Sequence, residues 1–278
     1  LKVYTTQDSK IQNILDEEYA DPSNYPDTVQ YELDYALTVT DPDGNQVNYS
    51  KEMLQLYFQN EDPDFDLLFD SPEDGQTYVD KYKASILANG SKVLAERVNF
   101  APQPQSSMSV IDQHTGYVKA LIGGRGEKTA SLTLNRATDT TRQPGSTFKI
   151  LAAYSAALDA GGLTLASVQD DAPYTYAGAN GKSVNNYDRR YRGFTTLREA
   201  ITDSINIVTV KTLAQAGVSL GWQYVQEYGF TTVDSRDMNE ALALGGITQG
   251  VSNLELTAAY AACLLYTSDA ADDRISVD

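Results

Sequence analysis

The 278-residue sequence contains only one histidine and one cysteine. Zinc sites are built mostly from several His and Cys side chains, and the acidic residues here show no metal-ligand spacing, so we expect no metal centre. A Ser-His-Asp hydrolase would need His114 beside a nucleophile. His114 lies in an expected turn, and no Gly-x-Ser-x-Gly sequence occurs, so this class of enzyme is also excluded.

Basic residues and long apolar runs are scarce as well. The chain has 21 Lys and Arg against 38 Asp and Glu, and its first 100 residues hold 20 acidic and 7 basic side chains. Such acidity argues against nucleic acid or an anionic membrane surface as a direct partner. No apolar run approaches the roughly 20 residues that span a bilayer, and no signal peptide opens the chain. Membrane attachment would need an anchor upstream of Leu1.

The clearest chemical signal is a Ser-x-x-Lys pair. Pro144-Gly145 predicts a sharp turn, and the apolar run that follows predicts a helix from Ser146 to about Ala160, ended by Gly161-Gly162. Ser146 and Lys149 then lie one helical turn apart on one face. A desolvated lysine can take the proton of a serine hydroxyl, and the free N–H of Ser146 can stabilise an oxyanion. The pair therefore indicates acyl transfer.

A Ser-x-Asn pair, Ser204-Ile205-Asn206, lies at the junction of two expected helices. Thr195 or Thr196 can cap the first helix, which ends near Asp203, and the second runs from Ile207 to Ala216. From such a junction a hydroxyl can relay a proton, and an amide can hold a substrate carbonyl or the lysine.

Both pairs have competing explanations. A serine at a helix start is more often only a helix cap, and short patterns occur by chance. Ser183-Val184-Asn185 repeats the Ser-x-Asn spacing, but it follows a loop-like stretch and precedes no helix, so we rank it below Ser204.

Together the two pairs resemble the transpeptidase domain of class A penicillin-binding proteins, which are related to the serine β-lactamases. The opening Leu1–Asp8 resembles the segment that leads from the glycosyltransferase domain of such proteins into the transpeptidase region. Between about residues 106 and 262, further segments match in the family's order: Asn135–Thr138, Arg142–Ser146, Asn186-Tyr187-Asp188, Tyr191-Arg192-Gly193, Leu197–Ala200, Ala243–Gly246 and Ala258–Ala261.

The resemblance implies an α/β (α+β) fold, in which a hairpin at 107–122 begins an antiparallel sheet and a helical half carries the motifs. It implies that Ser146 attacks peptidoglycan stem peptides, with Lys149 as base, Ser204 as proton relay and Asn206 as positioner. β-Lactams would acylate the same serine, no cofactor is needed, and the enzyme would work on the extracytoplasmic face of a bacterial membrane. The residues that it suggests for substrate binding are Gln143, Tyr187 and Gly193.

The family's third motif, Lys-Thr-Gly or Lys-Ser-Gly, does not follow Ser204. The near matches Lys211-Thr212-Leu213 and Lys128-Thr129-Ala130 are in the wrong context or order. Without that motif's cation, only burial remains to lower the pKa of Lys149. We therefore expect the 278 residues as they stand to be inactive and poorly stable.

Residues 263–273 resemble a translated sequencing adapter, so we expect the native sequence to end at about Ala262. The helix over 254–262 should continue only a little, through Leu264-Leu265, and the side chains beyond Thr267 should find no core. The residues concerned are Asp269, Asp272, Asp273, Ile275 and Val277. The expected organisation is an accessory or linker module (1–105), the first part of a transpeptidase domain (106–262) and a non-native tail (263–278).

Within the accessory module the patterns predict elements but no chemistry. The acidic stretch Glu61–Asp74 lacks the ligand order of a calcium loop and is expected to be solvated. The predicted elements are strands at Lys2–Thr5, Tyr31–Val39 and Gln46–Tyr49, helices at Lys10–Tyr19 and Gln76–Arg97, and a linker at Ala101–Gln105.

Two alternative functions stay open from the sequence. One is a related serine acyl-hydrolase, either a D,D-carboxypeptidase or a β-lactamase. The other is a non-catalytic β-lactam sensor or interaction module that keeps the fold. The presence of all four motif side chains argues against a decayed site, and the Asn186–Gly193 region favours the transpeptidase.

Overall fold

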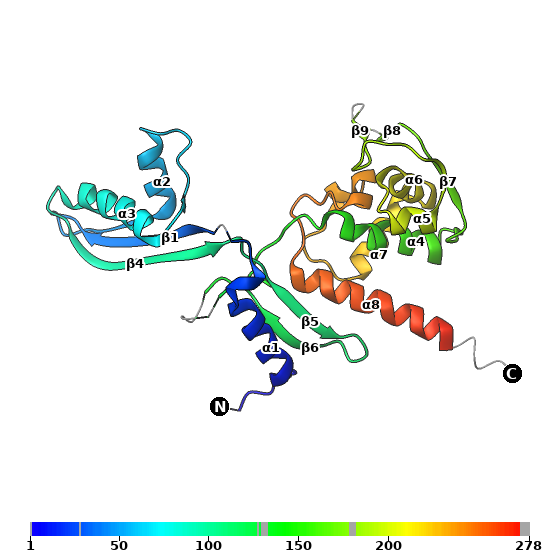
Figure 1. Ribbon diagram of the computed structural model, residues 1–278, viewed down its shortest axis with the longest axis horizontal. Helices are drawn as coiled ribbons and strands as arrows, with labels where there is room; N and C mark the ends of the chain where they lie inside the picture. Colours follow the sequence, from blue (N-terminus) through cyan, green and yellow to red (C-terminus); the bar gives the residue numbers. More distant parts are fainter. Residues whose placement is uncertain (1, 28, 127, 129–132, 178–181, 273–278) are drawn as a thin grey trace. The chain divides into compact units, whose positions relative to one another are not determined.

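The computed structural model describes residues 2–272 apart from 28, 127, 129–132 and 178–181, with side chains described as far as Leu265. The chain forms two compact units (Figure 1). The motif unit comprises Leu1–Leu15, Ser107–Gly124 and Ala130–Asp278, and the accessory unit comprises Asp16–Ser106 and Arg125–Thr129. The first fifteen residues, which we expected in the accessory module, thus group with the motif unit.

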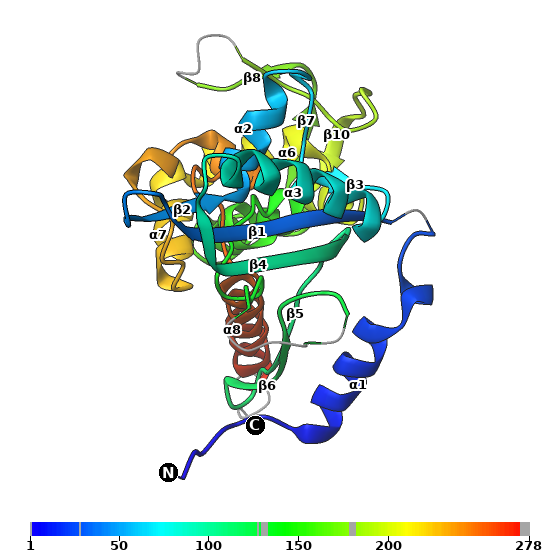
Figure 2. The same cartoon turned by 90° about the vertical axis from the view of Figure 1, so that its left-hand side faces the viewer.

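The accessory unit is an antiparallel sheet with two helices against one face (Figure 2). Leu33, Tyr35, Leu37 and Val39 alternate along β1 and are buried, because every second strand residue faces the helices. β1 pairs with all three other strands, and the predicted strands at Tyr31–Val39 and Gln46–Tyr49 are confirmed. The elements are β1 (Gln30–Thr40), β2 (Gln46–Ser50), α2 (Lys51–Gln59), β3 (Leu68–Phe69), α3 (Pro72–Leu87) and β4 (Lys92–Gln103).

The predicted helix over Gln76–Arg97 is wrong in its second half. α3 ends at Leu87, and the backbone of Gly90 has a φ of +93°, a left-handed conformation that no helix continues. The chain then enters β4, which pairs with β1 along its length. Pairing with a neighbouring strand outweighs the helical pattern of the sequence here. The expected linker at 101–105 accordingly begins inside a strand.

Other local predictions for this region had mixed outcomes. The helix expected at Lys10–Tyr19 is confirmed as α1 (Ser9–Ala20), which is followed by a short 3₁₀ turn, η1 (Pro22–Asn24). The strand expected at Lys2–Thr5 is wrong, since no strand forms there. Most of Glu61–Asp74 is exposed, as predicted, although it contains β3 and the first turn of α3.

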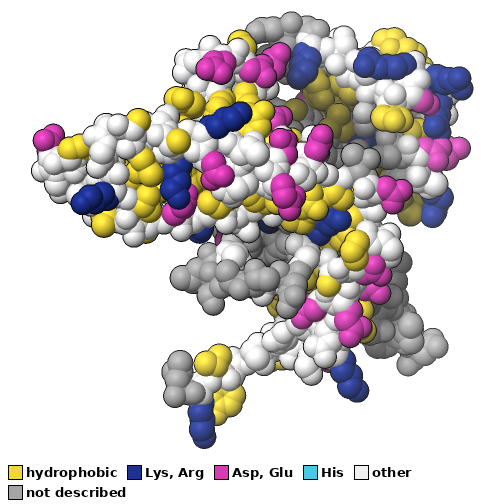
Figure 3. Space-filling view, turned by 60° about the vertical axis from the view of Figure 1, so that its left-hand side comes forward, with side chains coloured by type: hydrophobic (Ala, Val, Ile, Leu, Met, Phe, Trp, Pro, Cys, Tyr) yellow, Lys and Arg dark blue, Asp and Glu magenta, His cyan; other side chains and the backbone are white. Residues whose placement is uncertain are grey.

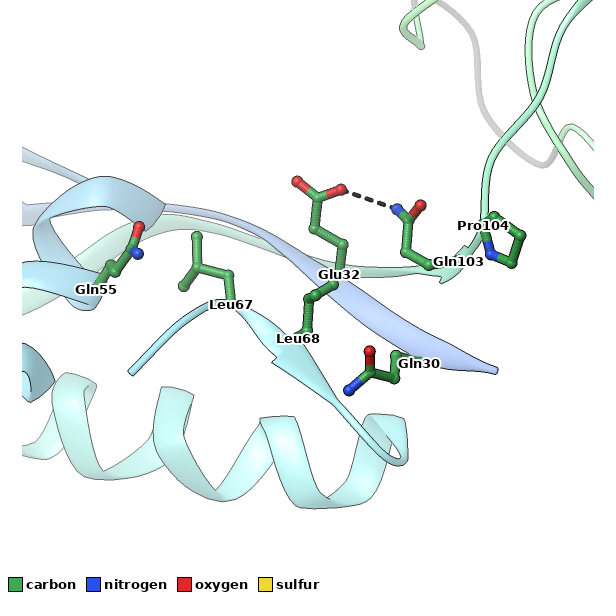
Figure 4. A pocket seen from close by; sticks show the side chains of 7 residues that line it. All are labelled: Gln30, Glu32, Gln55, Leu67, Leu68, Gln103 and Pro104. Atoms are coloured by element: carbon green, nitrogen blue, oxygen red, sulfur yellow. Dashed lines mark hydrogen bonds between the residues drawn. The ribbon is translucent and has the colours of Figure 1, made fainter. Parts of the chain in front are cut away.

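An open groove of about 630 Å³ lies beside β1 and β3 of the accessory unit (Figure 4). The Glu32 carboxylate accepts hydrogen bonds from Gln103 Nε2 at 2.9 Å and from Lys51 Nζ at 3.1 Å. Both of its oxygens therefore already have protein partners. The lining residues are Gln30, Glu32, Gln55, Leu67, Leu68, Gln103 and Pro104.

The predicted hairpin at 107–122 is confirmed in the motif unit. The start of the chain borders its second strand, because Asp8 donates its N–H to the Lys119 carbonyl at 2.7 Å. The amide of Gln12 also bonds both backbone groups of Leu121, at 3.1 and 3.0 Å. His114 is exposed in the turn, as expected. The strands are β5 (Met108–Asp112) and β6 (Tyr117–Ile122).

The rest of the motif unit is largely helical around two buried clusters. The main cluster includes Phe148, Leu151, Ile207 and Leu213, and a smaller one includes Tyr154, Leu197 and Val208. Trp222 is partly buried and packs against the main cluster. Two short strand pairs flank the helices. The elements are η2 (Gly145–Thr147), η3 (Ile150–Tyr154), α4 (Ser155–Asp159), β7 (Val168–Asp171) with β10 (Gly193–Thr196), β8 (Tyr174–Thr175) with β9 (Ser183–Val184), α5 (Leu197–Thr202), α6 (Asn206–Ala216), α7 (Val218–Glu227), η4 (Ser235–Asp237), η5 (Glu240–Leu244) and α8 (Asn253–Asp272).

The last helix is longer than predicted. α8 runs to Asp272 rather than ending near Leu265, and neither Gly nor Pro occurs after Leu254 to stop it. Cys263 packs against the main cluster. The predictions for the five side chains from Asp269 to Val277 concern side chains that the structure does not describe. None of the helices in the described part of the chain is long and apolar enough to cross a bilayer.

Candidate functional site

Ser146 lies in a tight turn at the start of an irregular helix. Gly145 has a φ of +57°, and the segment then passes through a 3₁₀ turn and a π-helical stretch into α4. The predicted helix from Ser146 to about Ala160 is confirmed in extent, although it is not a regular α-helix. Its irregular start leaves the Ser146 side chain exposed.

A second glycine allows the backbone after η5 to lie against this turn. A Cβ on Gly245 would come within 2.6 Å of the backbone N and O of Gly145, and Gly245 has a φ of +71°. Only glycine fits both the space and the conformation. The Ala243–Gly246 segment therefore supports the turn that carries Ser146.

Lys149 is buried, with 3% of its surface exposed. Its Nζ donates to the carbonyl of Ser204 at 2.6 Å, to the Ser204 hydroxyl at 2.9 Å and to Asn206 Oδ1 at 2.6 Å. The structure therefore joins the Ser-x-x-Lys pair to the Ser-x-Asn pair through the lysine.

Burial lowers the pKa of Lys149 from 10.5 to about 8. A charged ammonium loses its hydration when it leaves water, and this favours the neutral amine. Burial is the only cause of the shift, as the absence of the family's third motif had predicted. A lysine with this pKa is partly neutral near physiological pH and can accept a proton.

Ser204 lies between α5 and α6, and Asn206 is the first residue of α6, so the pair stands at the helix junction that the sequence predicts. Thr196 caps α5 in a reciprocal arrangement: its hydroxyl accepts from Glu199 N at 3.2 Å, and Glu199 Oε2 accepts from Thr196 N at 3.0 Å. Ser204 has a φ of +53°, uncommon for a residue with a side chain. This sharp backbone turn lets both the carbonyl and the hydroxyl of Ser204 reach the same ammonium.

The predicted substrate-binding residues are less closely connected to this centre. Gln143 is exposed, and its amide donates to the Ile247 carbonyl at 3.3 Å. Tyr187 is fully exposed, at 100%. Gly193 begins β10, opposite Asp171 of β7. Contact of these three residues with a substrate stays a prediction.

The rival Ser183-Val184-Asn185 occupies a different place. Ser183 and Val184 form β9, the Val184 side chain is buried, and Ser183 is exposed. The Asn185 carbonyl accepts from Asn206 Nδ2 at 2.7 Å. This segment supports the Ser204 motif through its backbone and does not supply a second set of catalytic side chains to Lys149.

Sequence reasoning did not single out two buried residues beside the site. Asn186 and Asp171 are 6% and 0% exposed, and Asn186 bonds the backbone at the start of α6. The only signal was the position of Asn186 in the Asn186-Tyr187-Asp188 match. Among the side chains that the structure describes, no group of three His, Cys, Asp or Glu residues could hold a metal ion.

Comparison with known proteins gives a consistent pattern. The family described as the penicillin binding protein transpeptidase domain matches residues 107–267. Penicillin-binding protein 1A of Clostridium tetani is 39% identical over 173 residues, which cover 57% of this chain and 21% of the relative. The protein of the same name from Neisseria flavescens is 46% identical over 133 residues, covering 46% of this chain and 16% of the relative.

The chain therefore spans about a fifth or less of the length of these curated relatives. A crystal structure of penicillin-binding protein 1A from Haemophilus influenzae has a similar fold. It superposes with a TM-score of 0.52 at 20% sequence identity, covering 94% of this chain and 36% of that one.

Proposed function

The chain belongs to the penicillin-binding protein transpeptidase family, and on that premise we propose that Ser146 is the nucleophile of a serine D,D-transpeptidase. The observation that carries the proposal is the buried Lys149, which bonds both members of the Ser204/Asn206 pair. The substrates would be peptidoglycan stem peptides, and β-lactams would acylate the same hydroxyl. The enzyme would act outside the cytoplasmic membrane, and the whole protein would also contain a glycosyltransferase domain.

The proposed chemistry begins with the amine of Lys149 acting as the base. Neutral Lys149 takes the Ser146 hydroxyl proton while the serine oxygen attacks the penultimate D-alanine carbonyl. The tetrahedral intermediate collapses, the amide C–N bond breaks, and Ser204 relays the proton from Lys149 to the departing D-alanine amine. An amine from a second stem peptide then attacks the Ser146 ester and releases the cross-linked product. The acceptor amine loses one proton to Lys149, which returns it to the Ser146 oxygen, so the cycle needs no cofactor.

Two features support the roles of the surrounding residues. Asn206 Oδ1 accepts a hydrogen bond from Lys149 Nζ, which supports the proposed role of Asn206 as a positioner of the lysine. Gln143 is anchored next to the Ser146 turn and is proposed to contact the stem peptide, together with Tyr187 and Gly193. If water replaces the acceptor amine, the same site would act as a carboxypeptidase or a β-lactamase, so the acceptor must be tested directly.

Acylation by benzylpenicillin tests the nucleophile. The test uses a chimera. Residues 1–262 of this chain are joined to the region of the Clostridium tetani protein that follows its matched segment. The added region is chosen to supply the third motif. Mass spectrometry should place the adduct on the peptide that contains Ser146, and Ser146→Ala should abolish it. Ser183→Ala is the matched control and should label normally. The 278-residue chain should label far more slowly, and an adduct on another residue would contradict the assignment.

The role of Lys149 has its own test. Lys149→Ala should slow acylation by roughly 10²- to 10⁴-fold, the usual contribution of a general base, while initial penicillin binding changes little. In the chimera with Lys149 intact the acylation rate should rise with pH and level off at or below about 8, because the lysine must lose its proton first and the third motif's cation lowers its pKa further than burial alone. Stopped-flow measurements at several penicillin concentrations separate binding from acylation. Equal acylation rates in the two proteins would remove Lys149 from the mechanism.

A further inference from the structure

Helix α6, which carries Asn206 at its first position, has no cap of its own. The residue before it is Ile205, whose apolar side chain makes no capping hydrogen bond. The first backbone N–H groups of a helix have no partner within the helix and need one from outside. Asn186 supplies it: its Oδ1 accepts from the N–H groups of Asn206 and Ile207, at 3.1 and 3.2 Å.

The orientation of the Asn186 amide is fixed from behind. Its Nδ2 donates to both carboxylate oxygens of Asp171, at 2.8 and 3.0 Å, and to the Arg190 carbonyl at 2.8 Å. An ionised carboxylate can only accept hydrogen bonds, so the NH₂ group must face Asp171 and the oxygen must face α6. Asp171 is fully buried and also accepts from Arg192 N at 2.9 Å.

Asn185, the residue before Asn186, fixes the orientation of the Asn206 side-chain amide in the same way. Asn206 Nδ2 donates to the Asn185 carbonyl at 2.7 Å, which leaves Oδ1 pointing at Lys149 Nζ, 2.6 Å away. Two consecutive residues therefore hold both the backbone and the side chain of Asn206. Asn186 is almost completely buried and would not touch a substrate.

We propose that Asn186, oriented by Asp171, is a positioning residue that caps α6 from outside and thereby holds Asn206 against Lys149. The proposal deepens the proposed function and rests on it for the roles of Lys149 and Asn206. The hydrogen bonds that cap α6 and orient Asn186 lie among described residues and involve no substrate. It can therefore be tested without any acylation.

Amide hydrogen exchange in the 278-residue chain, followed by NMR, is the first test. First-turn amides of a helix without a cap exchange quickly, whereas the N–H groups of Asn206 and Ile207 should be protected in the native chain. Exchange of these two amides at the rate of an unstructured peptide, while amides in the interior of α6 stay protected, would overturn the proposal. This measurement needs no variant, so it is decisive even if a substitution prevents folding.

Asn186→Ala and Asn185→Ala form a matched pair of variants. Asn185 is exposed and contributes through its backbone carbonyl, which alanine retains. Asn186→Ala should speed exchange at the Asn206 and Ile207 amides and at the Asn206 side-chain NH₂ by about tenfold, whereas Asn185→Ala should leave all three within about twofold. Equal effects from the two variants, or uniform acceleration at every amide, would overturn the proposal.

A charge exchange supplies a rescue experiment. Asn186→Asp alone places two carboxylates against each other and should speed exchange at the start of α6. The double variant Asp171→Asn/Asn186→Asp restores one donor and one acceptor and should bring exchange back to within about threefold of the native rate. A double variant no better than Asn186→Asp would contradict the orienting role of Asp171. Absence of a penicillin adduct on Ser146 in the chimera, with protection intact, would remove the proposed function but leave the positioning role standing.

Discussion

Lys149 makes the free energy of unfolding depend on pH. Its pKa is about 8 in the folded chain and about 10.5 when unfolded, so between these values the unfolded state binds more protons. Stability therefore rises with pH across this window, and the contribution is lost as pH falls through 8. Between pH 7 and 10, the free energy of unfolding of the native chain should rise by roughly 2 to 3 kcal/mol relative to that of Lys149→Met.

Urea unfolding at a series of pH values measures this difference. Comparison with Lys149→Met cancels the titration of tyrosines that both proteins share. Lys10→Met, at an exposed position on α1, is the control for losing a cation elsewhere. A stability difference that stays flat from pH 7 to 10 would mean that Lys149 keeps its ordinary titration in the folded chain.

Gly245 and Gly116 allow a steric effect to be separated from a conformational one. Their φ angles are +71° and +70°, but a Cβ on Gly116 would meet nothing within 4 Å, whereas one on Gly245 would meet Gly145 at 2.6 Å. Both alanine variants should lose about 1 kcal/mol for the left-handed backbone. Gly245→Ala should lose a further 1 to 3 kcal/mol and slow acylation of Ser146, because the turn must move. Similar urea midpoints for the two variants would contradict this account.

The sequence could predict the site residues that are close in the chain but not the contacts between distant ones. Ser146 and Lys149 share a helix, and Ser204 and Asn206 share a helix junction, so spacing alone places each pair. The contact of Lys149 with Ser204 comes from tertiary packing, and only the family resemblance suggested it. The role of Asn186 depends on two buried partners, and no local pattern marks such a residue.

α2 offers a test of packing at the level of one element. Leu54 is fully buried in the accessory core, while Leu56, two residues later on the opposite side, is 63% exposed. Removing buried methyl groups costs transfer free energy and leaves a cavity, so Leu54→Ala should lose about 2 to 5 kcal/mol of stability. Leu56→Ala should stay within about 0.5 kcal/mol. Comparable losses from both would mean that α2 does not pack as described.

The elements that the sequence predicted well have strong local signals. Residues Asp41–Gly44 form a turn in which Gly44 donates its N–H to the Asp41 carbonyl at 3.0 Å, and this turn joins β1 to β2. This turn sequence and the alternation along β1 give a hairpin whichever residues pack against it. α3 and β4 are different, because the residues after Gly90 suit either a helix or a strand. β4 pairs with β1 (Gln30–Thr40), which lies more than fifty residues earlier in the chain, and this pairing decides that the residues after Gly90 form a strand. Long-range pairing of this kind is not visible in a local pattern.

The two units of the whole chain have separate cores. One cluster of buried residues runs from Leu33 to Ile86, and another contains Phe148 and Ala259. On the face seen in Figure 3, acidic side chains are spread out, with Lys and Arg among them. Each unit therefore has what a separate folding domain needs: its own apolar cluster and a polar exterior.

We accordingly expect residues 16–106 to fold when expressed alone. All buried members of the accessory core lie within this range, and its four-stranded sheet is large enough to be stable with two helices against it. Circular dichroism should show a cooperative thermal transition, and Leu54→Ala should lower stability by the same amount as in the full chain. Lys149→Met in the full chain should leave that transition unmoved, because the two residues belong to different cores. A gradual melt of 16–106, or a Leu54→Ala effect that differs between the two contexts by more than about 1 kcal/mol, would show that the accessory unit depends on the motif unit for its stability.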